Sequence, residues 1–324
     1  VISVICLIFL NRLITLFVAT NDIREYAKEY FTIIVLGNIF STGFSSIIRA
    51  EGRIKYALLI WLIPTGVNIV FDYIFIFVIK LGVAGVALAT LMCQITSFLM
   101  SILFFVKFSS QKFEFKNIKL NEIKDILTLG VNALLQSAGL SIIIFIINKI
   151  LASVYDYTYI TSFSYVSKMA QIAIVPLNAV TTALSPIISF NYSSSKYKRV
   201  KISVLYSLIY SYICSVIEMT VLFIFSKKLA MIFTSNQTII NQCNDIINIL
   251  LISLLFVPAV LIISTYFQAI KNKKYAFLIT AFLLITISAF LFILKSNCIW
   301  FAIPISCFIT FLLSIYLYKK RLPN

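Results

Sequence analysis

The sequence contains no histidine and few charged residues. Without imidazole groups, the chain has no histidine for acid–base catalysis or for a catalytic triad, and it lacks the commonest metal ligand. Charged residues make up only 12% of the 324 positions, whereas 61% are hydrophobic and the mean hydropathy is +1.03. A soluble domain is far less apolar than this. We therefore expect a protein that is not an enzyme, that needs no cofactor and whose solvent is not water.

Paired cysteines and a conventional start are also missing. The six cysteines show no paired spacing and most lie in apolar runs, so we interpret them as small packing residues. The chain begins with Val1 inside an apolar run, without a methionine, a charged n-region or a cleavage site. We interpret this start as a cut N-terminus.

Long apolar runs dominate what is present. Many of them reach the roughly 18 residues that a helix needs to cross a bilayer core. The runs are continuously apolar rather than alternating, which favours helices over the strands of an outer-membrane barrel. We predict an all-α integral membrane protein with ten spans, at residues 2–19, 30–48, 56–79, 83–106, 126–153, 160–190, 200–225, 239–270, 275–294 and 299–318.

The basic residues behind the net charge of +16 lie mainly in the loops between spans, so the charge does not indicate a nucleic-acid surface. The loops after the second, fourth, sixth and eighth predicted spans, together with the C-terminus, hold 18 Lys and Arg residues, whereas the opposite loops hold 6. Lys and Arg are concentrated on the cytoplasmic side of membrane proteins. We therefore expect no nucleic-acid partner, a multi-pass protein of the cell membrane and a cytoplasmic C-terminus.

An internal repeat predicts two lobes. The segments RAEGRIKYALLI (49–60) and QAIKNKKYAFLI (268–279) share six identities in twelve positions and lie six predicted spans apart. This spacing favours parallel repeats of six helices, as in some transporters. We expect an N-terminal lobe at 1–106 with four of its six helices, a cytoplasmic connection at 107–124 and a complete C-terminal lobe at 125–324. The intact protein would then have twelve helices.

The motifs of three segments, residues 49–94, 186–200 and 257–276, resemble those of one transporter family, the multidrug and toxic compound extrusion (MATE) transporters. Residues 49–94 are similar to its helices four to six, with Arg-Ala-x-Gly, Asn-x-x-x-Asp, Gly-x-x-Gly and Ala-Thr. Residues 186–200 and 257–276 are similar to its Pro-x-x-x-x-Asn-Tyr segment and to its Tyr-Phe-Gln-Ala helix end, although Lys271 stands where the family has glycine. The resemblance implies that Asn68, Asp72 and Thr90 line the cavity of the N-terminal lobe.

Acidic residues inside apolar spans are costly, so each needs an explanation. Asp72 lies within a span, and Asn68 stands four residues earlier on the same helical face. Thr90 lies as far after the turn near Leu81 as Asp72 lies before it, so the two can face each other. Pro64 can kink the helix as a hinge. We expect Asp72, Asn68 and Thr90 to form the ion-coupling site, with H⁺ or Na⁺ at Asp72. The alternative is that Asp72 only pairs with a lysine or joins a structural polar network.

The C-terminal lobe has a second set of candidate cavity residues. Glu218 lies within an apolar span, and Lys168 of the preceding span is its expected partner, in a structural ion pair or in a transport role. Gln136, Asn148 and Gln268 are further polar positions, and Gln136 lies near where some relatives carry an acidic residue. Each can line a cavity or form hydrogen bonds between helices.

These observations predict a secondary active transporter that exports organic cations in exchange for H⁺ or Na⁺ by alternating access. Its partners would be the lipid bilayer and small cationic substrates bound by aromatic side chains, and we expect a monomer. The alternative within the wider superfamily is a lipid-linked oligosaccharide flippase. That function needs several cations for a pyrophosphate, and only Arg12, Lys149 and Lys168 lie in or at the ends of spans.

Overall fold

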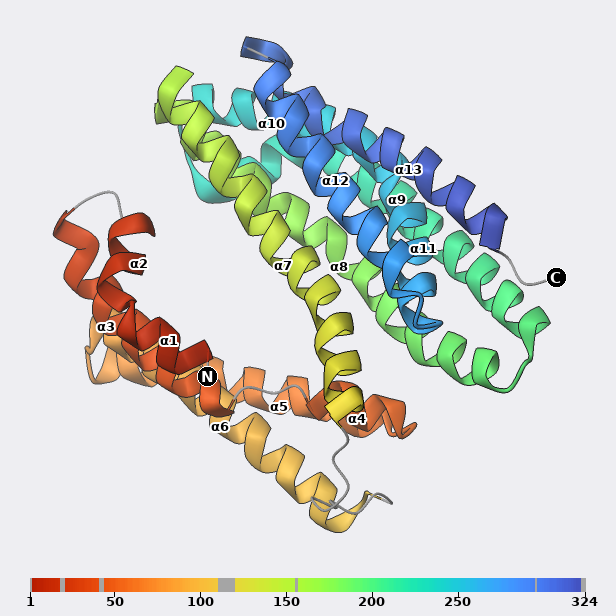
Figure 1. The fold of residues 1–324 in the computed structure, drawn as a ribbon. Helices are drawn as coiled ribbons and strands as arrows, with labels where there is room; N and C mark the ends of the chain where they lie inside the picture. Colours follow the sequence, from red (N-terminus) through yellow and green to blue (C-terminus); the bar gives the residue numbers. More distant parts are fainter. Residues whose placement is uncertain are drawn as a thin grey trace. The chain divides into compact units, whose positions relative to one another are not determined.

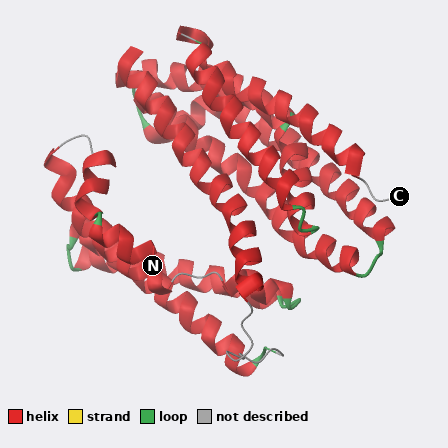
Figure 2. Ribbon diagram, viewed as in Figure 1, coloured by secondary structure: helices red, strands yellow, loops and turns green. Residues whose placement is uncertain are grey.

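The computed structural model describes residues 2–17, 21–40, 44–109, 120–154, 157–294 and 296–321. Within these ranges the regular structure is entirely helical, and Figure 2 shows helices joined by loops. The chain divides into two compact units, Val1–Asn117 and Ile118–Asn324, termed the N-terminal unit and the C-terminal unit. The division falls inside the polar connection at 107–124.

The N-terminal unit contains the long helices α5 and α6 and several shorter ones (Figure 1). Its long final helices form a hairpin, and its earlier helices are interrupted. In chain order the elements are α1 (Ile2–Ile8), α2 (Leu10–Phe17), α3 (Asn21–Gly37), the 3-10 helix η1 (Asn38–Phe40), α4 (Phe44–Ala50), α5 (Ile54–Tyr73), the π-helix η2 (Ile74–Val78) and α6 (Gly82–Lys107).

The antiparallel hairpin of α5 and α6 is held by contacts along its whole length. Near one end, Tyr56 donates its hydroxyl hydrogen to the Met100 carbonyl at 2.8 Å. Further along, Ser97 donates to the Ile60 carbonyl at 3.3 Å. At the turn, a Cβ on Gly85 would lie only 3.0 Å from the Phe75 Cβ, so the absence of a side chain allows the close approach.

Helix α3 packs on α6 and runs parallel to it. Gly37, at the end of α3, lies directly against the side chain of Gln94. One turn later the rings of Phe40 and Phe98 pack edge to face, with centroids 5.5 Å apart. Helix α6 therefore contacts α5 and α3 at once, and its side chains lie at the centre of the unit.

The C-terminal unit is a bundle in which α8 and α9 form one long hairpin and α12 and α13 lie side by side (Figure 1). Helix α11 lies between them and contacts α8, α9, α12 and α13. The elements are α7 (Leu120–Val154), α8 (Tyr157–Ser193), α9 (Tyr197–Phe233), α10 (Gln237–Leu251), the 3-10 helix η4 (Ile252–Leu255), α11 (Val257–Ala269), α12 (Lys273–Ile293), the 3-10 helix η5 (Ser296–Phe301) and α13 (Ala302–Arg321).

Two hydrophobic clusters form the core of this unit. The first joins α7, α8 and α10 through residues such as Ile147, Val166 and Ile247. The second surrounds α11, where Tyr266 and Phe267 are fully buried. Helix α11 is short but almost wholly enclosed by its neighbours, which explains why it is apolar around its circumference.

Eight helices in the described part of the chain are long and apolar enough to cross a membrane. Their outer surfaces are apolar too. In the apolar 18-residue stretch of Ile54–Val78, only 11% of the residues are buried inside the protein, so most of its apolar side chains face outward. Exposed side chains of this kind need lipid as their solvent. The predicted all-helical membrane fold is therefore confirmed, and the six-helix repeat stays a prediction.

The count of ten spans differs from the structure at three places. The predicted span 2–19 consists of two helices, α1 and α2, each too short to cross a bilayer. The predicted span 126–153 falls on α7, which has the length but whose described apolar stretch is Ser141–Leu151. The predicted span 239–270 is interrupted by η4, so α10 and α11 share it.

The two segments that suggested a repeat end their helices with the same turn. After α4, Gly52 has a φ of +80°, and the amides of Gly52 and Arg53 donate to the carbonyls of Arg49 and Ile48 at 2.9 and 3.2 Å. After α11, the aligned Lys271 has a φ of +58°, and its amide and that of Asn272 donate to the aligned carbonyls at 3.0 and 2.8 Å. This is the Schellman arrangement of a helix C-terminus.

We expect Lys271→Gly to stabilise the protein, because a lysine in the left-handed region is strained by about 1 kcal/mol and glycine is not. The free energy of unfolding, measured on purified chain in detergent, should rise by about that amount. The control is Lys201→Gly in the exposed face of α9, where glycine should lower stability by about 1 kcal/mol. A loss of stability in both variants would show that Lys271 makes a compensating contact.

Candidate ion-coupling site

Asp72 lies at the end of α5 with one carboxylate oxygen shielded and unpaired. Its side chain is half-buried, and its Oδ1 is inaccessible and has no hydrogen-bond partner. In the described part of the N-terminal unit, only one other side-chain oxygen shares these properties, the Oε1 of Gln94. A shielded carboxylate oxygen without a partner is costly unless a proton or a cation accompanies it.

The backbone becomes irregular directly after Asp72. Helix α5 ends at Tyr73, and the π-helix Ile74–Val78 follows, with the Ile79 amide donating to the Ile74 carbonyl at 2.9 Å. Single π-helical turns inside longer helices occur often at functional sites. Pro64 is buried, but α5 continues through it, so the irregular backbone adjoins Asp72 and not the expected hinge.

Asn68 and Thr90 lie close to Asp72 along the hairpin. Asn68 is half-buried on the face of α5 that carries Asp72. The Ser97 bond to Ile60 and the packing of Gly85 on Phe75 fix the register of α5 and α6. By that register Thr90 lies within about one helical turn of Asp72. The Thr90 hydroxyl donates to its own helix, to the Val86 carbonyl at 3.0 Å, and its oxygen lone pairs stay available as acceptors.

Gln94 is a further shielded polar residue of the N-terminal unit that the sequence analysis did not single out. It follows Thr90 by four residues on α6, so a search for polar residues on the same helical face would have found it. Its Oε1 is shielded and unpaired, and its side chain lies against Gly37 of α3. By the register of α5 and α6 it lies opposite Pro64, about two turns from Asp72.

The expected pair of Glu218 and Lys168 does not form. Lys168 is exposed on α8, and its Nζ lies 5.6 Å from the centroid of Phe233, a ring that also stacks on Tyr165. Phe233 ends α9, about four turns from Glu218. Both carboxylate oxygens of Glu218 are shielded and lack a hydrogen-bond partner. Lys168 therefore takes part in a cation–π contact and does not neutralise this acid.

The other candidates of the C-terminal unit do not gather around Glu218. Gln268 is half-buried near the end of α11, and its Nε2 donates weakly to Ser264 at 3.4 Å. Asn148 on α7 is half-buried with an unpaired Oδ1. Gln136 falls within α7, but its side chain lies outside the described residues.

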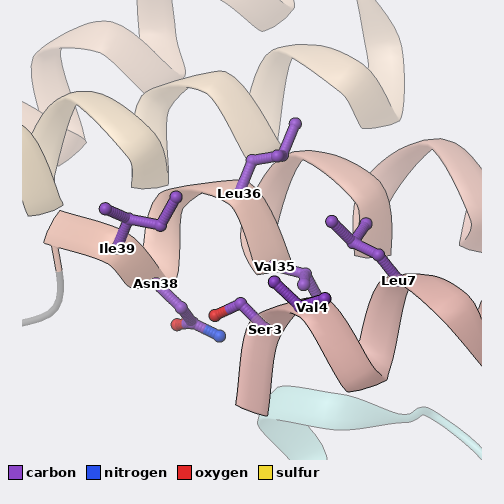
Figure 3. A pocket seen from close by; sticks show the side chains of 7 residues that line it. All are labelled: Ser3, Val4, Leu7, Val35, Leu36, Asn38 and Ile39. Atoms are coloured by element: carbon purple, nitrogen blue, oxygen red, sulfur yellow. The ribbon is translucent and has the colours of Figure 1, made fainter. Parts of the chain in front are cut away.

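A separate hollow of about 630 Å³ lies in the N-terminal unit, between α1 and the end of α3 with η1 (Figure 3). Its lining is mainly aliphatic, with Val4, Leu7 and Val35, and Figure 3 shows the polar groups of Ser3 and Asn38 next to each other. The residues that line it carry no titratable side chain.

The chemistry of the Asp72 site suits a proton or a hard monovalent cation. Its candidate donors are the Asp72 carboxylate, the Asn68 side-chain amide and the Thr90 hydroxyl, and oxygen ligands of this type prefer hard cations. Throughout the described residues, there is no group of three or more His, Cys, Asp or Glu that could hold a metal ion. A single carboxylate balances a single positive charge.

The described chain is thus a helical membrane protein with a shielded, unpaired carboxylate oxygen inside a hairpin of candidate spans. The sequence model of the MatE family matches residues 1–74 and 132–294, well over half of the chain. The chain therefore belongs to the MatE family, the family of MATE transporters that the sequence resembles.

Curated relatives and solved structures agree with this assignment. The multidrug export protein MepA of Staphylococcus haemolyticus is 24% identical over 79% of this chain, and the match spans 57% of the length of that relative. MepA of Staphylococcus aureus (strain MRSA252) is 24% identical, over 99% of this chain and 74% of its own length. The structure of a MOP superfamily transporter from Pyrococcus furiosus has the same fold, with a TM-score of 0.92 at 22% identity over 99% of this chain and 75% of that one.

Proposed function

We propose that this protein is a secondary active exporter of organic cations that uses an H⁺ or Na⁺ gradient. Its membership of the MatE family and its similarity to two multidrug export proteins support export of drugs. The observation that carries the coupling is the shielded, unpaired Oδ1 of Asp72 beside a π-helix. An acid in that position binds a cation when it is charged and is neutral when protonated, so either ion can be exchanged for a cationic substrate.

Alternating access would use the two units as its moving parts, with the Asp72 site entirely within the N-terminal one. Binding of an ion at α5 changes the charge beside the π-helix, where the backbone has an alternative hydrogen-bond pattern available. The 29 Phe and 17 Tyr residues supply aromatic faces that attract organic cations. The proposed location is the cell membrane, with the basic C-terminal end in the cytoplasm.

The flippase alternative is weaker in its chemistry. The cations that lie in or at the ends of the predicted spans are Arg12, Lys149 and Lys168, and all three are exposed on their helices. Arg12 lies over the Phe9 ring at 6.0 Å, and Lys168 is in contact with Phe233. Because the Arg12 and Lys168 side chains are exposed and lie over aromatic rings, neither forms a buried binding site for an anion.

Reconstituted vesicles distinguish these two functions. We expect the protein to drive export of a cationic dye against its gradient, and we expect no acceleration of the flipping of a lipid-linked oligosaccharide. Both assays use the same vesicle preparation, with protein-free vesicles as the blank. Lipid flipping without dye transport would overturn the proposal in favour of a flippase.

A further inference from the structure

One end of the C-terminal unit carries a dense group of cations. Positions 196–201, at the start of α9, hold four Lys or Arg residues, and positions 271–274, at the turn before α12, hold three. Both residues at 319–320, near the end of α13, are lysines. All of these side chains are exposed except that of Lys273, which is half-buried. We term these three segments the basic end.

The three segments of the basic end lie close together because the helix ends before them are bonded or packed. Near the end of α8, Ser189 donates its hydroxyl hydrogen to the carbonyl of Ala269 at the end of α11, at 3.0 Å. On the other side of α11, the rings of Tyr266 and Tyr318 pack edge to face with centroids 5.1 Å apart. Figure 1 shows the α8–α9 turn, the α11–α12 turn and the end of α13 at the same end of the unit.

Acidic side chains do not neutralise this end. None of the three segments contains Asp or Glu. The acidic side chains that the structure describes in the C-terminal unit are those of Glu218 and Asp245. Glu218 lies about 25 Å along α9 from Lys201, well beyond the distance at which salt screens exposed charges. Asp245 is farther still, because its neighbour Asn244 is bonded to Ser226, beyond Glu218 on α9.

Tyrosines mark the level of the basic end along the bundle. Tyr192 and Tyr197 pack edge to face across the α8–α9 turn, with ring centroids 5.5 Å apart, and Tyr275 lies in the first turn of α12. The Nζ of Lys320 lies 5.7 Å from the centroid of the exposed Tyr316 ring. Tyrosine is enriched where a membrane protein crosses the lipid headgroups, and lysine extends its ammonium group to the same level. The exposed cations therefore lie at the depth of the headgroups.

Lys271 occupies a backbone position that suits glycine better. Its φ of +58° is in the left-handed region, and the aligned residue in the repeat segment of the N-terminal unit is Gly52, with a φ of +80°. The Lys271 side chain is exposed, so no burial in the core offsets the strain. Strained residues that persist in a structure often serve a function. Here the strain places one more cation at the centre of the basic end.

The corresponding turn of the N-terminal unit carries much less charge. Residues 49–55 contain three cations and one acid, Glu51, whose Oε1 accepts a hydrogen bond from the Ser109 hydroxyl at 2.8 Å. Lys55 is aligned with Lys274 and is equally exposed. A turn of the same construction thus exists with a small net charge. The charge of the basic end is therefore not required by the shape of the turn.

We propose that the basic end binds the phosphate groups of anionic phospholipids in the leaflet that surrounds it. Lys and Arg close to a negatively charged membrane surface are attracted to it, and clusters of them on helix ends bind lipid headgroups. Phospholipid phosphates are the anions that are always present at the depth of the tyrosines. Several neighbouring ammonium groups can contact one phosphate, whereas a zwitterionic lipid brings its own cation to the same place.

The test is a titration of the purified chain, in an uncharged detergent, with fluorescently labelled phosphatidylglycerol. Phosphatidylcholine with the same label and acyl chains is the matched lipid. We expect saturable binding of phosphatidylglycerol that is at least tenfold tighter than that of phosphatidylcholine and that high salt weakens. Lys274→Gln and Lys271→Gly should each weaken it about fivefold, the usual contribution of one cation near an anionic surface.

Lys271→Gly separates lipid binding from folding, because it should lower lipid affinity while it raises stability. Two further variants are controls. Lys55→Gln changes the aligned lysine of the N-terminal unit, and Lys228→Gln changes an exposed lysine near the other end of α9, so both should bind phosphatidylglycerol as the unmodified chain does.

Three results would overturn the inference. They are equal affinity for the two lipids, equal losses in Lys274→Gln and in the two controls, and displacement of the labelled lipid by an equal concentration of inorganic phosphate. The measurement involves neither ion coupling nor dye export. Its outcome is therefore independent of the proposed export function.

Discussion

Replacing Asp72 by asparagine is expected to abolish coupled drug export while the protein still inserts and folds. Asparagine has nearly the same shape as aspartate but can neither carry the charge nor release a proton. Because coupling at this site requires a carboxylate that changes its charge, the variant should show only background export. Growth of a drug-sensitive host in a cationic drug, and dye export from its cells, measure the loss.

The variant should remain stable because the substitution leaves no hydrogen-bonding group without its partner. The Oδ1 of Asp72 has no hydrogen-bond partner, so the substitution breaks no bond at that atom. Its unfolding midpoint in detergent should therefore equal that of the unmodified protein. Asp245→Asn, which changes an exposed acid of α10, is the control and should export normally. Full export by Asp72→Asn would exclude Asp72 as the coupling residue.

Gly85→Leu is expected to cause the largest loss of stability among the glycine variants of the N-terminal unit. A Cβ at this position would lie 3.0 Å from the Phe75 Cβ and 3.2 Å from the Phe75 backbone carbon. The backbone contact cannot be relieved by a rotamer change, so the α5–α6 hairpin would have to separate. Overpacking of this kind costs about 1–3 kcal/mol or more. Export should fall too, because the separation displaces Thr90 from Asp72.

The matched control is Gly66→Leu on α5. No atom lies within 4 Å of a Cβ built there, and glycine costs helix stability, so this variant should be neutral or slightly stabilised. Thermal unfolding in detergent and retention of a single peak on size-exclusion chromatography compare the two variants. Equal stability of Gly85→Leu and Gly66→Leu would contradict the close packing of the hairpin turn.

The membrane fold and the proximity of Asn68, Asp72 and Thr90 could be predicted from sequence because both depend on local patterns. Continuous apolar runs identify spans, since length and composition alone decide whether a helix can cross a bilayer. The spacing of Asn68 and Asp72 fixes a shared face once a helix is assumed, and a hairpin turn near Leu81 brings Thr90 to a similar depth. The structure retains these relations.

The helix interruptions could not be predicted in the same way. The segment Ile252–Leu255 and its flanks are as apolar as a regular span, so hydropathy carries no sign of the change in hydrogen bonding. Pro258 was the one local signal, because proline favours the first turn of a helix over its interior. For the π-helix after Asp72 we find no comparable signal in the sequence.

Contacts between helices were the second feature that could not be predicted from the sequence. Lys168 and Glu218 were paired on charge alone, but charge gives no information on register, and Lys168 lies beside Phe233 at the far end of α9. Correcting that pairing changes the interpretation of Glu218. Its carboxylate has no partner among the described residues, so the expected ion pair with Lys168 is wrong.

The most direct test of the central claim is a simultaneous measurement of ion and dye movement in vesicles. An outwardly directed gradient of a cationic dye should drive H⁺ or Na⁺ in the opposite direction in vesicles that contain the unmodified protein. The account predicts that Asp72→Asn removes this ion movement completely, whereas Asp245→Asn leaves it unchanged. Dye movement that proceeds without any counterflow of H⁺ or Na⁺, or counterflow that persists in Asp72→Asn, would contradict it.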